Sequence, residues 1–232
     1  MINARTLAIV ACGIVSLTRG VDGQSPSQYR NFALGSDLAA VSALAGVDPA
    51  AAKTIHQRPA VLQELEWRPS RWIPATNASS VDPVDQVLFS FYNDQLFRVV
   101  VDYGHERTEG MTTADMIEAV SSIYGAVLQR SPRVAGRPAS QLETESGSLA
   151  AHWGDSEHRV LLYHTSSYGA AYRLIVLDAR FDDLARKAAT QAGRLDDQEA
   201  PAREIARQKK ERDDAVVAAA KARAANKARF RP

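Results

Sequence analysis

The sequence predicts an α+β fold, in which an antiparallel sheet is packed with helices and is followed by a long, charged helical tail. Three observations lead to this prediction: one strong hairpin pattern, two segments with helical spacing and caps, and a change of composition after Asp178. We divide the 232 residues into a leader (1–23), a folded domain (24–178) and a tail (179–232). A domain of this length can bury a core of its own.

The leader has the three-part layout of a secretory signal peptide. Arg5 is followed by thirteen uncharged and mostly apolar residues at 6–18, and small residues then precede Gln24. The apolar run is shorter than the roughly 20 residues that cross a bilayer. We therefore expect export to the periplasm or the medium, with the segment either cleaved before Gln24 or retained as an N-terminal anchor.

Cys12 is the only cysteine of the chain. It stands in a string that fits a bacterial lipidation site, but fewer than the usual minimum of about 7 apolar residues separate it from Arg5. A chain cleaved after Gly23 has no cysteine, which excludes disulfides, a cysteine nucleophile and thiolate metal sites.

The charge balance excludes a strong overall field. The chain has 28 basic and 27 acidic residues, and removal of Arg5, Arg19 and Asp22 with the leader leaves 26 of each. A neutral protein does not attract nucleic acid by its global charge. We expect no nucleic-acid partner.

The strongest element is a hairpin of Val87–Tyr92 and Gln95–Tyr103. The two segments are rich in valine, phenylalanine and tyrosine, and Asn93 and Asp94 between them tolerate the positive φ angles of a type I′ turn. The expected pairs are Tyr92 with Gln95, Phe91 with Leu96, Phe89 with Arg98 and Val87 with Val100. Both faces of this pair are apolar, which predicts a central position in a sheet that is covered on both sides.

Before the hairpin, residues 36–45 have helical spacing, with Ser36 as the expected N-cap and Gly46 as the stop. Asp48 and Pro49 are expected to open a second short helix. Residues 61–67 then read as a strand, and 69–83 as a loop.

After the hairpin, Thr112 or Thr113 is expected to cap a helix with apolar residues from Met116 to Val127. A loop at 129–146 and three strands at 148–153, 159–165 and 171–178 complete the domain.

The two halves of the domain repeat one order of elements, since each has a helix, a glycine (Gly46 or Gly125), a loop and antiparallel strands. In this order residues 29–178 resemble the tandem helix-plus-sheet units of the beta-lactamase-inhibitor-like fold of exported bacterial proteins. The resemblance implies a non-enzymatic binding module.

The tail is expected to form two helices. The first, 179–192, has Leu184, Ala185 and Ala188 on a narrow apolar side and is interrupted at Gly193. The second starts near Asp196 or Asp197 and runs to about 228, supported by opposite charges four residues apart. Its apolar positions are too few for a strong coiled-coil seam, so we expect a solvated projection.

The last part of the tail is basic, with no acid after Asp214. Its cations are candidates for contact with an anionic surface, such as lipid head groups or a cell-wall polymer: Lys221, Arg223, Lys227, Arg229 and Arg231.

One cluster has residue types that acid/base catalysis needs: His105 with Asp102 or Glu106, just after the hairpin. The other interpretation is a solvated loop in front of the helix near Thr113. There is no GxSxG motif, phosphate loop or dinucleotide fingerprint, and no pair of histidines converges by spacing, so we expect no cofactor and no metal.

Large aromatic residues are a second kind of candidate, because they often anchor interfaces, although core packing is their commoner role. The candidates are Trp67, Trp72, Tyr92, Phe97 and Trp153. The sequence thus favours a non-catalytic exported protein that binds a protein or an envelope surface, with a hydrolase built on His105 as the alternative.

Overall fold

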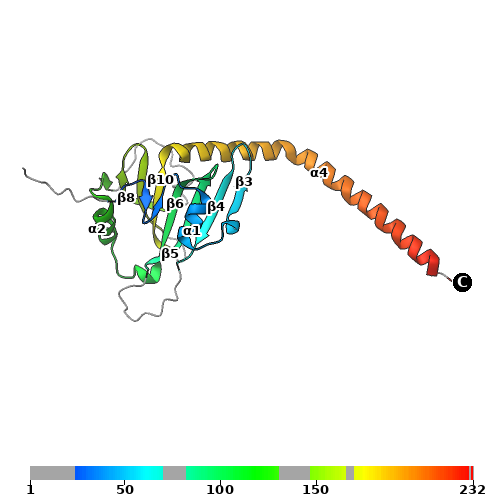
Figure 1. The fold of residues 1–232 in the computed structure, drawn as a ribbon, viewed down its shortest axis with the longest axis horizontal. Helices are drawn as coiled ribbons and strands as arrows, with labels where there is room; N and C mark the ends of the chain where they lie inside the picture. Colours follow the sequence, from blue (N-terminus) through cyan, green and yellow to red (C-terminus); the bar gives the residue numbers. More distant parts are fainter. Residues whose placement is uncertain (1–23, 70–81, 131–146, 166–169, 230, 232) are drawn as a thin grey trace, which may run out of the picture.

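The computed structural model describes residues 24–69, 82–130, 147–165, 170–229 and 231. The predicted leader, the aromatic candidate Trp72, and most of the loop expected at 129–146 lie outside these residues. Figure 1 shows the described chain as a sheet with packed helices and one long helix that extends far beyond them.

The sheet has eight strands in the order β3-β4-β5-β6-β10-β9-β8-β7, and every neighbouring pair is antiparallel. A separate two-stranded sheet joins β1 (Gln28–Tyr29) and β2 (Phe32–Ala33). The eight strands are β3 (Lys53–His56), β4 (Leu62–Trp67), β5 (Val84–Tyr92), β6 (Gln95–Gly104), β7 (Gln129–Arg130), β8 (Ser148–Gly154), β9 (His158–His164) and β10 (Ala170–Asp178).

The helices precede the strands in each half, which confirms the α+β class and the two similar halves. The helix α1 (Leu38–Ala45) comes before the meander β3 to β6, and α2 (Thr113–Tyr124) comes before the meander β7 to β10. The two meanders meet where β6 pairs with β10. Two short 3-10 turns, η1 (Pro49–Ala51) and η3 (His105–Arg107), and the long C-terminal helix α4 (Ala179–Arg229) complete the described elements.

Local capping chemistry explains where the helices begin and end. Thr112, one of the two predicted caps, begins α2 and forms a reciprocal capping box with Asp115. Gly46 ends α1 in the left-handed conformation (φ 66°). The expected cap Ser36 was wrong by one residue: Asp37 accepts from the backbone of Ala40, while the Ser36 carbonyl instead accepts from the Leu96 amide.

The central hairpin has the predicted turn and the two predicted pairs beside it, Tyr92 with Gln95 and Phe91 with Leu96, but not the predicted register farther along. Asn93 and Asp94 have φ angles of 47° and 68°, as a type I′ turn requires. Pairing then shifts by one residue after Phe91 and Leu96. Phe89 therefore lies opposite Val99 instead of Arg98, and Val87 lies opposite Val101 instead of Val100.

This shift is a β-bulge, which places two consecutive residues on the same side of the strand. Phe97 and Arg98 both contact α4, Phe97 through the small cluster with Leu62 and Ala185, and Arg98 through an ion pair with Asp182. The bulge turns Val99 and Val101 into the main core, where both are fully buried.

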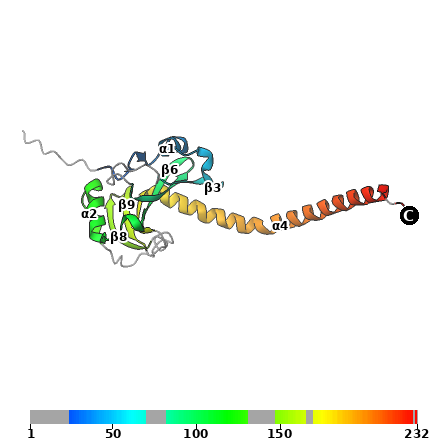
Figure 2. The same cartoon turned by 90° about the horizontal axis from the view of Figure 1, so that it is seen from below.

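The sheet is covered on both faces, which confirms the prediction from the hairpin. One face packs against α1 and α2 around the main core, which includes Val41, Phe89, Val120 and Trp153. The other face packs against the first turns of α4. Figures 1 and 2 show α4 starting beside the sheet and continuing beyond it.

The tail forms one helix of 51 residues from Ala179, so the predicted break at Gly193 was wrong. A glycine within a helix costs only about 1 kcal/mol relative to alanine, and its many helix-forming neighbours outweigh that cost. Pro201 lies inside α4, and a proline lacks the amide that the helix ladder needs. Figure 1 shows α4 changing direction partway along its length, as a proline kink does.

The first part of α4 belongs to the folded domain. The buried positions are Asp182, Ala185, Ala188 and Ala192. Leu184, which we expected on the apolar side, is 37% exposed instead. Small side chains on the docking face allow the helix to approach the sheet closely. Among the described residues, no helix has both the length and the apolar character that crossing a membrane requires.

Candidate functional site

The predicted catalytic cluster is not assembled in the structure. Asp102 lies on β6 opposite Arg173 of β10, and the two side chains form a bidentate ion pair with nitrogen–oxygen distances of 2.6 and 2.9 Å. The hydrogen bonds to Asp102 raise the pKa of Arg173. The Asp102 carboxylate is therefore occupied in linking the two halves of the sheet.

His105 and Glu106 lie on η3 and are exposed to solvent. Within the described residues, no hydrogen bond or ion pair joins the His105 ring to either carboxylate. A general base needs a positioned partner and a shielded substrate. The arrangement around His105 supplies neither.

The predicted aromatic candidates are divided between the two faces of the sheet. Trp153 is fully buried in the main core, and its indole nitrogen donates to Ser121 of α2 at 3.1 Å. Trp67 packs near Phe89 in the same core. These two side chains therefore belong to the main core between the sheet and the helices α1 and α2.

Tyr92 and Phe97 lie on the opposite face, beneath α4. The Tyr92 ring lies 5.9 Å from the Phe181 ring, between centroids, and Phe97 is 6% exposed. The four described aromatic candidates thus do not line one groove. Trp72, the fifth, lies outside the described residues.

In the parts of the chain that the structure describes, no three side chains among histidine, aspartate, glutamate and cysteine come together as metal ligands would. His152 has its pKa lowered, first by burial and second by Arg159. A histidine in this state remains a neutral side chain within the sheet.

The feature that stands out is the way α4 is held at its base. The buried Arg98 guanidinium pairs with the buried Asp182 carboxylate, and Arg186 binds the other oxygen of Asp182 at 2.9 Å. Burial raises the pKa of Asp182 and lowers that of Arg98, while their mutual attraction opposes both shifts. Sequence reasoning missed this pair, because the bulge at Phe97 that turns Arg98 toward α4 has no local signal.

A second ion pair holds α4 farther out. Arg58, between β3 and β4, binds Glu199, which also accepts from Arg203 at 2.9 Å. From Pro201 to Arg229 every residue is exposed. This free stretch is about 43 Å long at the rise of an α-helix.

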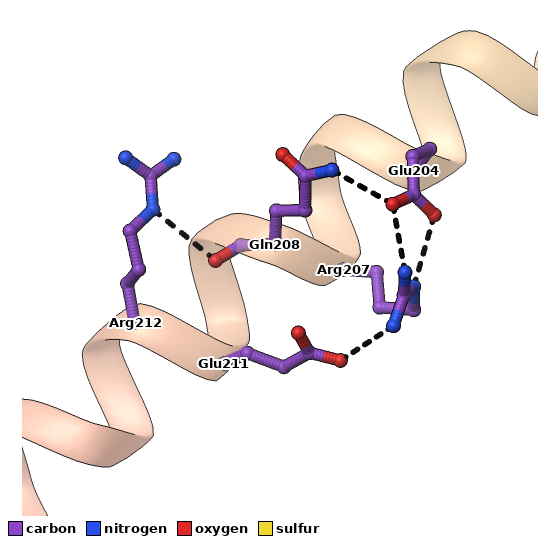
Figure 3. Close-up of polar contacts among 5 residues, drawn as sticks. All are labelled: Glu204, Arg207, Gln208, Glu211 and Arg212. Carbon is purple, nitrogen blue, oxygen red and sulfur yellow. Dashed lines mark hydrogen bonds and ion pairs between the residues drawn. The ribbon is translucent and has the colours of Figure 1, made fainter.

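Ion pairs along the helix support its first free turns. Arg207 binds Glu204 and Glu211, each at 2.7 Å, and Gln208 donates to Glu204 at 2.8 Å. Figure 3 shows this chain of contacts on the outside of the helix. Glu199 with Arg203 and Arg207 with Glu211 are opposite charges four residues apart, of the kind that the sequence predicts to support this helix.

The end of the helix has a different surface. Lys221, Arg223, Lys227 and Arg229 are exposed, and no acidic residue follows Asp214. At 100° per residue these four side chains point to several sides of the helix. We call residues 215–229 the basic end of α4.

Comparison of the chain with protein-family models, with curated proteins and with solved structures found no match. The resemblance of residues 29–178 to the beta-lactamase-inhibitor-like fold stays a prediction.

Proposed function

We propose that this protein is a non-catalytic binding protein of the bacterial cell envelope, and that the basic end of α4 binds an anionic envelope surface. The observation that carries the proposal is the fully exposed helix from Pro201 to Arg229, whose last part has cations and no acids. Export rests on the signal-like leader, with a periplasmic or secreted location.

The docked base of α4 supports this role, because it gives the projecting part a fixed origin. The buried pair of Arg98 and Asp182 and the outer pair of Arg58 and Glu199 hold the helix at two points. The ion pairs around Arg207 then support the helix where it has no sheet to pack on. The domain thus presents the basic end at a distance from its own surface.

The mode of binding follows from the pattern of side chains. The cations surround the helix, and the basic end has no broad apolar face that could insert into a bilayer. Attraction therefore depends on charge, contributing about 1 kcal/mol for each cation near an anionic membrane. Such attraction is screened by salt.

The test is sedimentation with vesicles of phosphatidylcholine, with and without phosphatidylglycerol. The variant replaces Lys221, Arg223 and Lys227 by glutamine, and the matched control replaces Lys209, Lys210 and Arg212, where acids alternate with the cations. Both variants lose the same net charge.

We expect the protein to bind anionic vesicles at low salt and to dissociate at high salt. The variant at the basic end should bind about 100-fold more weakly, and the control should lose much less. Equal losses in both variants, or no difference between anionic and neutral vesicles, would reject the role of the basic end.

Export has its own test, which is independent of the tail. Expression in a bacterial host, cell fractionation and mass spectrometry of the N-terminus should yield a periplasmic or secreted chain that starts at Gln24. A cytoplasmic chain with Met1 intact would contradict the proposed compartment.

A further inference from the structure

A cavity of about 280 Å³ lies between α2 and the centre of the sheet, on the face opposite α4. Its wall is mainly apolar and includes Met111, Met116, Val120, Ile123 and Leu174. Ile123 is 45% exposed, so the cavity reaches the surface along α2. This volume is close to the lower limit for small-molecule sites, which begins at about 300 Å³.

Three tyrosines from distant parts of the chain also line this cavity: Tyr29, Tyr103 and Tyr124. The Tyr124 hydroxyl donates to the Gln28 carbonyl at 3.0 Å. The Tyr29 side chain is 5% exposed, and its buried hydroxyl makes no hydrogen bond of ordinary length among the described residues, although it lies close enough to the Tyr103 hydroxyl to lower the pKa of Tyr103 slightly. Buried hydroxyls rarely stay unpaired, because the lost hydration is costly.

The charges around the cavity select against a cation. Its lining includes Arg30 and Arg107 but neither aspartate nor glutamate. The Arg30 guanidinium lies 5.3 Å from the centre of the Tyr29 ring. It donates two hydrogen bonds, of 2.7 and 2.8 Å, to the Asp82 carboxylate. Arg107 is exposed at the rim.

The tyrosines are hydrogen-bond donors at neutral pH. The pKa of Tyr103 is raised to about 12, first by burial, with Arg30 acting in the opposite direction. Burial also raises the pKa of Tyr29 and of Tyr124. A phenol that keeps its proton offers it to an acceptor on a ligand.

We propose that this cavity is a binding site for a small apolar molecule that carries a carbonyl oxygen, and that the Tyr29 hydroxyl donates a hydrogen bond to that oxygen. A molecule of about a dozen non-hydrogen atoms fits the volume, given that a cavity of about 150 Å³ accepts benzene. The apolar wall binds the body of the molecule, and Tyr29 selects the oxygen.

The methionines make this site directly observable. The chain has three methionines, and Met111 and Met116 both line the cavity. The purified protein, labelled with carbon-13 at the methionine methyl groups, is titrated with 2-acetylnaphthalene and with 2-ethylnaphthalene. The two compounds are similar in shape, and only the first has a carbonyl oxygen.

We expect both methyl resonances to shift in a saturable way, with the ketone binding about fivefold more tightly than the hydrocarbon. Tyr29→Phe keeps the shape of the side chain and should make the two affinities equal. Tyr92→Phe, on the other face of the sheet, should leave the preference unchanged. Ala119→Trp, at the rim, should block both compounds while circular dichroism shows an intact fold.

Two results would overturn the proposal. One is the absence of any saturable shift of the Met111 and Met116 signals with either compound. The other is a preference for the ketone that survives in Tyr29→Phe. Neither result bears on the basic end of α4, so this site and the proposed function stand or fall separately.

Discussion

Removal of the Asp182 carboxylate should release the base of α4 from the sheet. Asp182 is 4% exposed, and its main partner, Arg98, is 7% exposed. The Arg98 Nε atom has no hydrogen-bond partner among the described residues, and Asp182 is the charge that compensates this guanidinium most strongly. In Asp182→Ala, a permanently charged group stays buried without its counter-ion.

The expected cost is about 3–5 kcal/mol, as found when one member of a buried ion pair is removed. Arg186 adds little to this loss, because it is 39% exposed and keeps its contact with Asp183 at 2.6 Å. The docking face of α4 is built largely of alanines, at 185, 188 and 192. Apart from these alanines, Phe181 at the start of α4 packs against Tyr92, so the helix is held by this apolar contact and by the buried ion pair together.

The matched control is Asp183→Ala, one residue along the same turn. The Asp183 side chain is 63% exposed, and its ion pair with Arg186 lies at the surface. Such pairs contribute about 0–1 kcal/mol. The two variants remove the same charge from neighbouring positions and differ only in burial.

Hydrogen exchange measures the local release of α4, and urea unfolding measures the stability of the whole domain. In Asp182→Ala, amides at 179–192 should lose protection, while strands of the main core stay protected, because that core lies on the other face of the sheet. Tryptophan fluorescence follows global unfolding, since Trp153 is buried in the main core. Equal protection and stability in both variants, or a loss below about 1 kcal/mol, would refute this account of how α4 is held.

Two glycines should respond to alanine with opposite signs. Gly154 has φ 104°, and a Cβ there would clash with the His158 carbonyl oxygen, so Gly154→Ala should destabilise the protein by about 3 kcal/mol. Gly193 has open space around it, so Gly193→Ala should stabilise α4 by about 1 kcal/mol. Urea unfolding and circular dichroism measure both effects. The pKa of Glu199 is lowered from 4.5 to about 2, first by Arg58, so the contact stabilises above pH 4.5 and is lost as the pH falls through about 2. Arg58→Ala should raise that pKa toward 4.5 in a carboxyl NMR titration.

Arg68→Ala is the control for the titration, because Arg68 pairs with Glu66 on β4 and does not touch α4. A Glu199 pKa that stays near 2 in Arg58→Ala would show that Arg203 alone holds the carboxylate. For the glycines, a destabilised Gly193→Ala would contradict the continuous helix through that position.

The sequence alone predicted those features that depend on a few neighbouring residues. Asn93 and Asp94 set the hairpin turn through their tolerance of positive φ, and Thr112, one of the two predicted caps, set the start of α2. The change of composition after Asp178 marked the start of α4 at Ala179. Apolar residues on both faces of the hairpin correctly indicated a sheet covered on both sides.

Tertiary structure decided the features in which distant residues meet. The bulge after Leu96 moved Val99 and Val101 into the core and turned Arg98 toward α4, and no local pattern announced it. Asp102 was a candidate catalytic residue in the sequence, but its partner Arg173 lies 71 residues away on the paired strand.

The two proposed sites differ in the same way, one formed by neighbouring residues and the other by distant ones. The basic end of α4 was visible in the sequence, because a solvated helix takes its surface directly from the order of its residues. The cavity was not, since Tyr29, Tyr103 and Tyr124 meet only after β1, β6 and α2 have packed together. Periodicity and capping act over a few residues, whereas the register of the sheet and the docking of helices determine which distant side chains share a space.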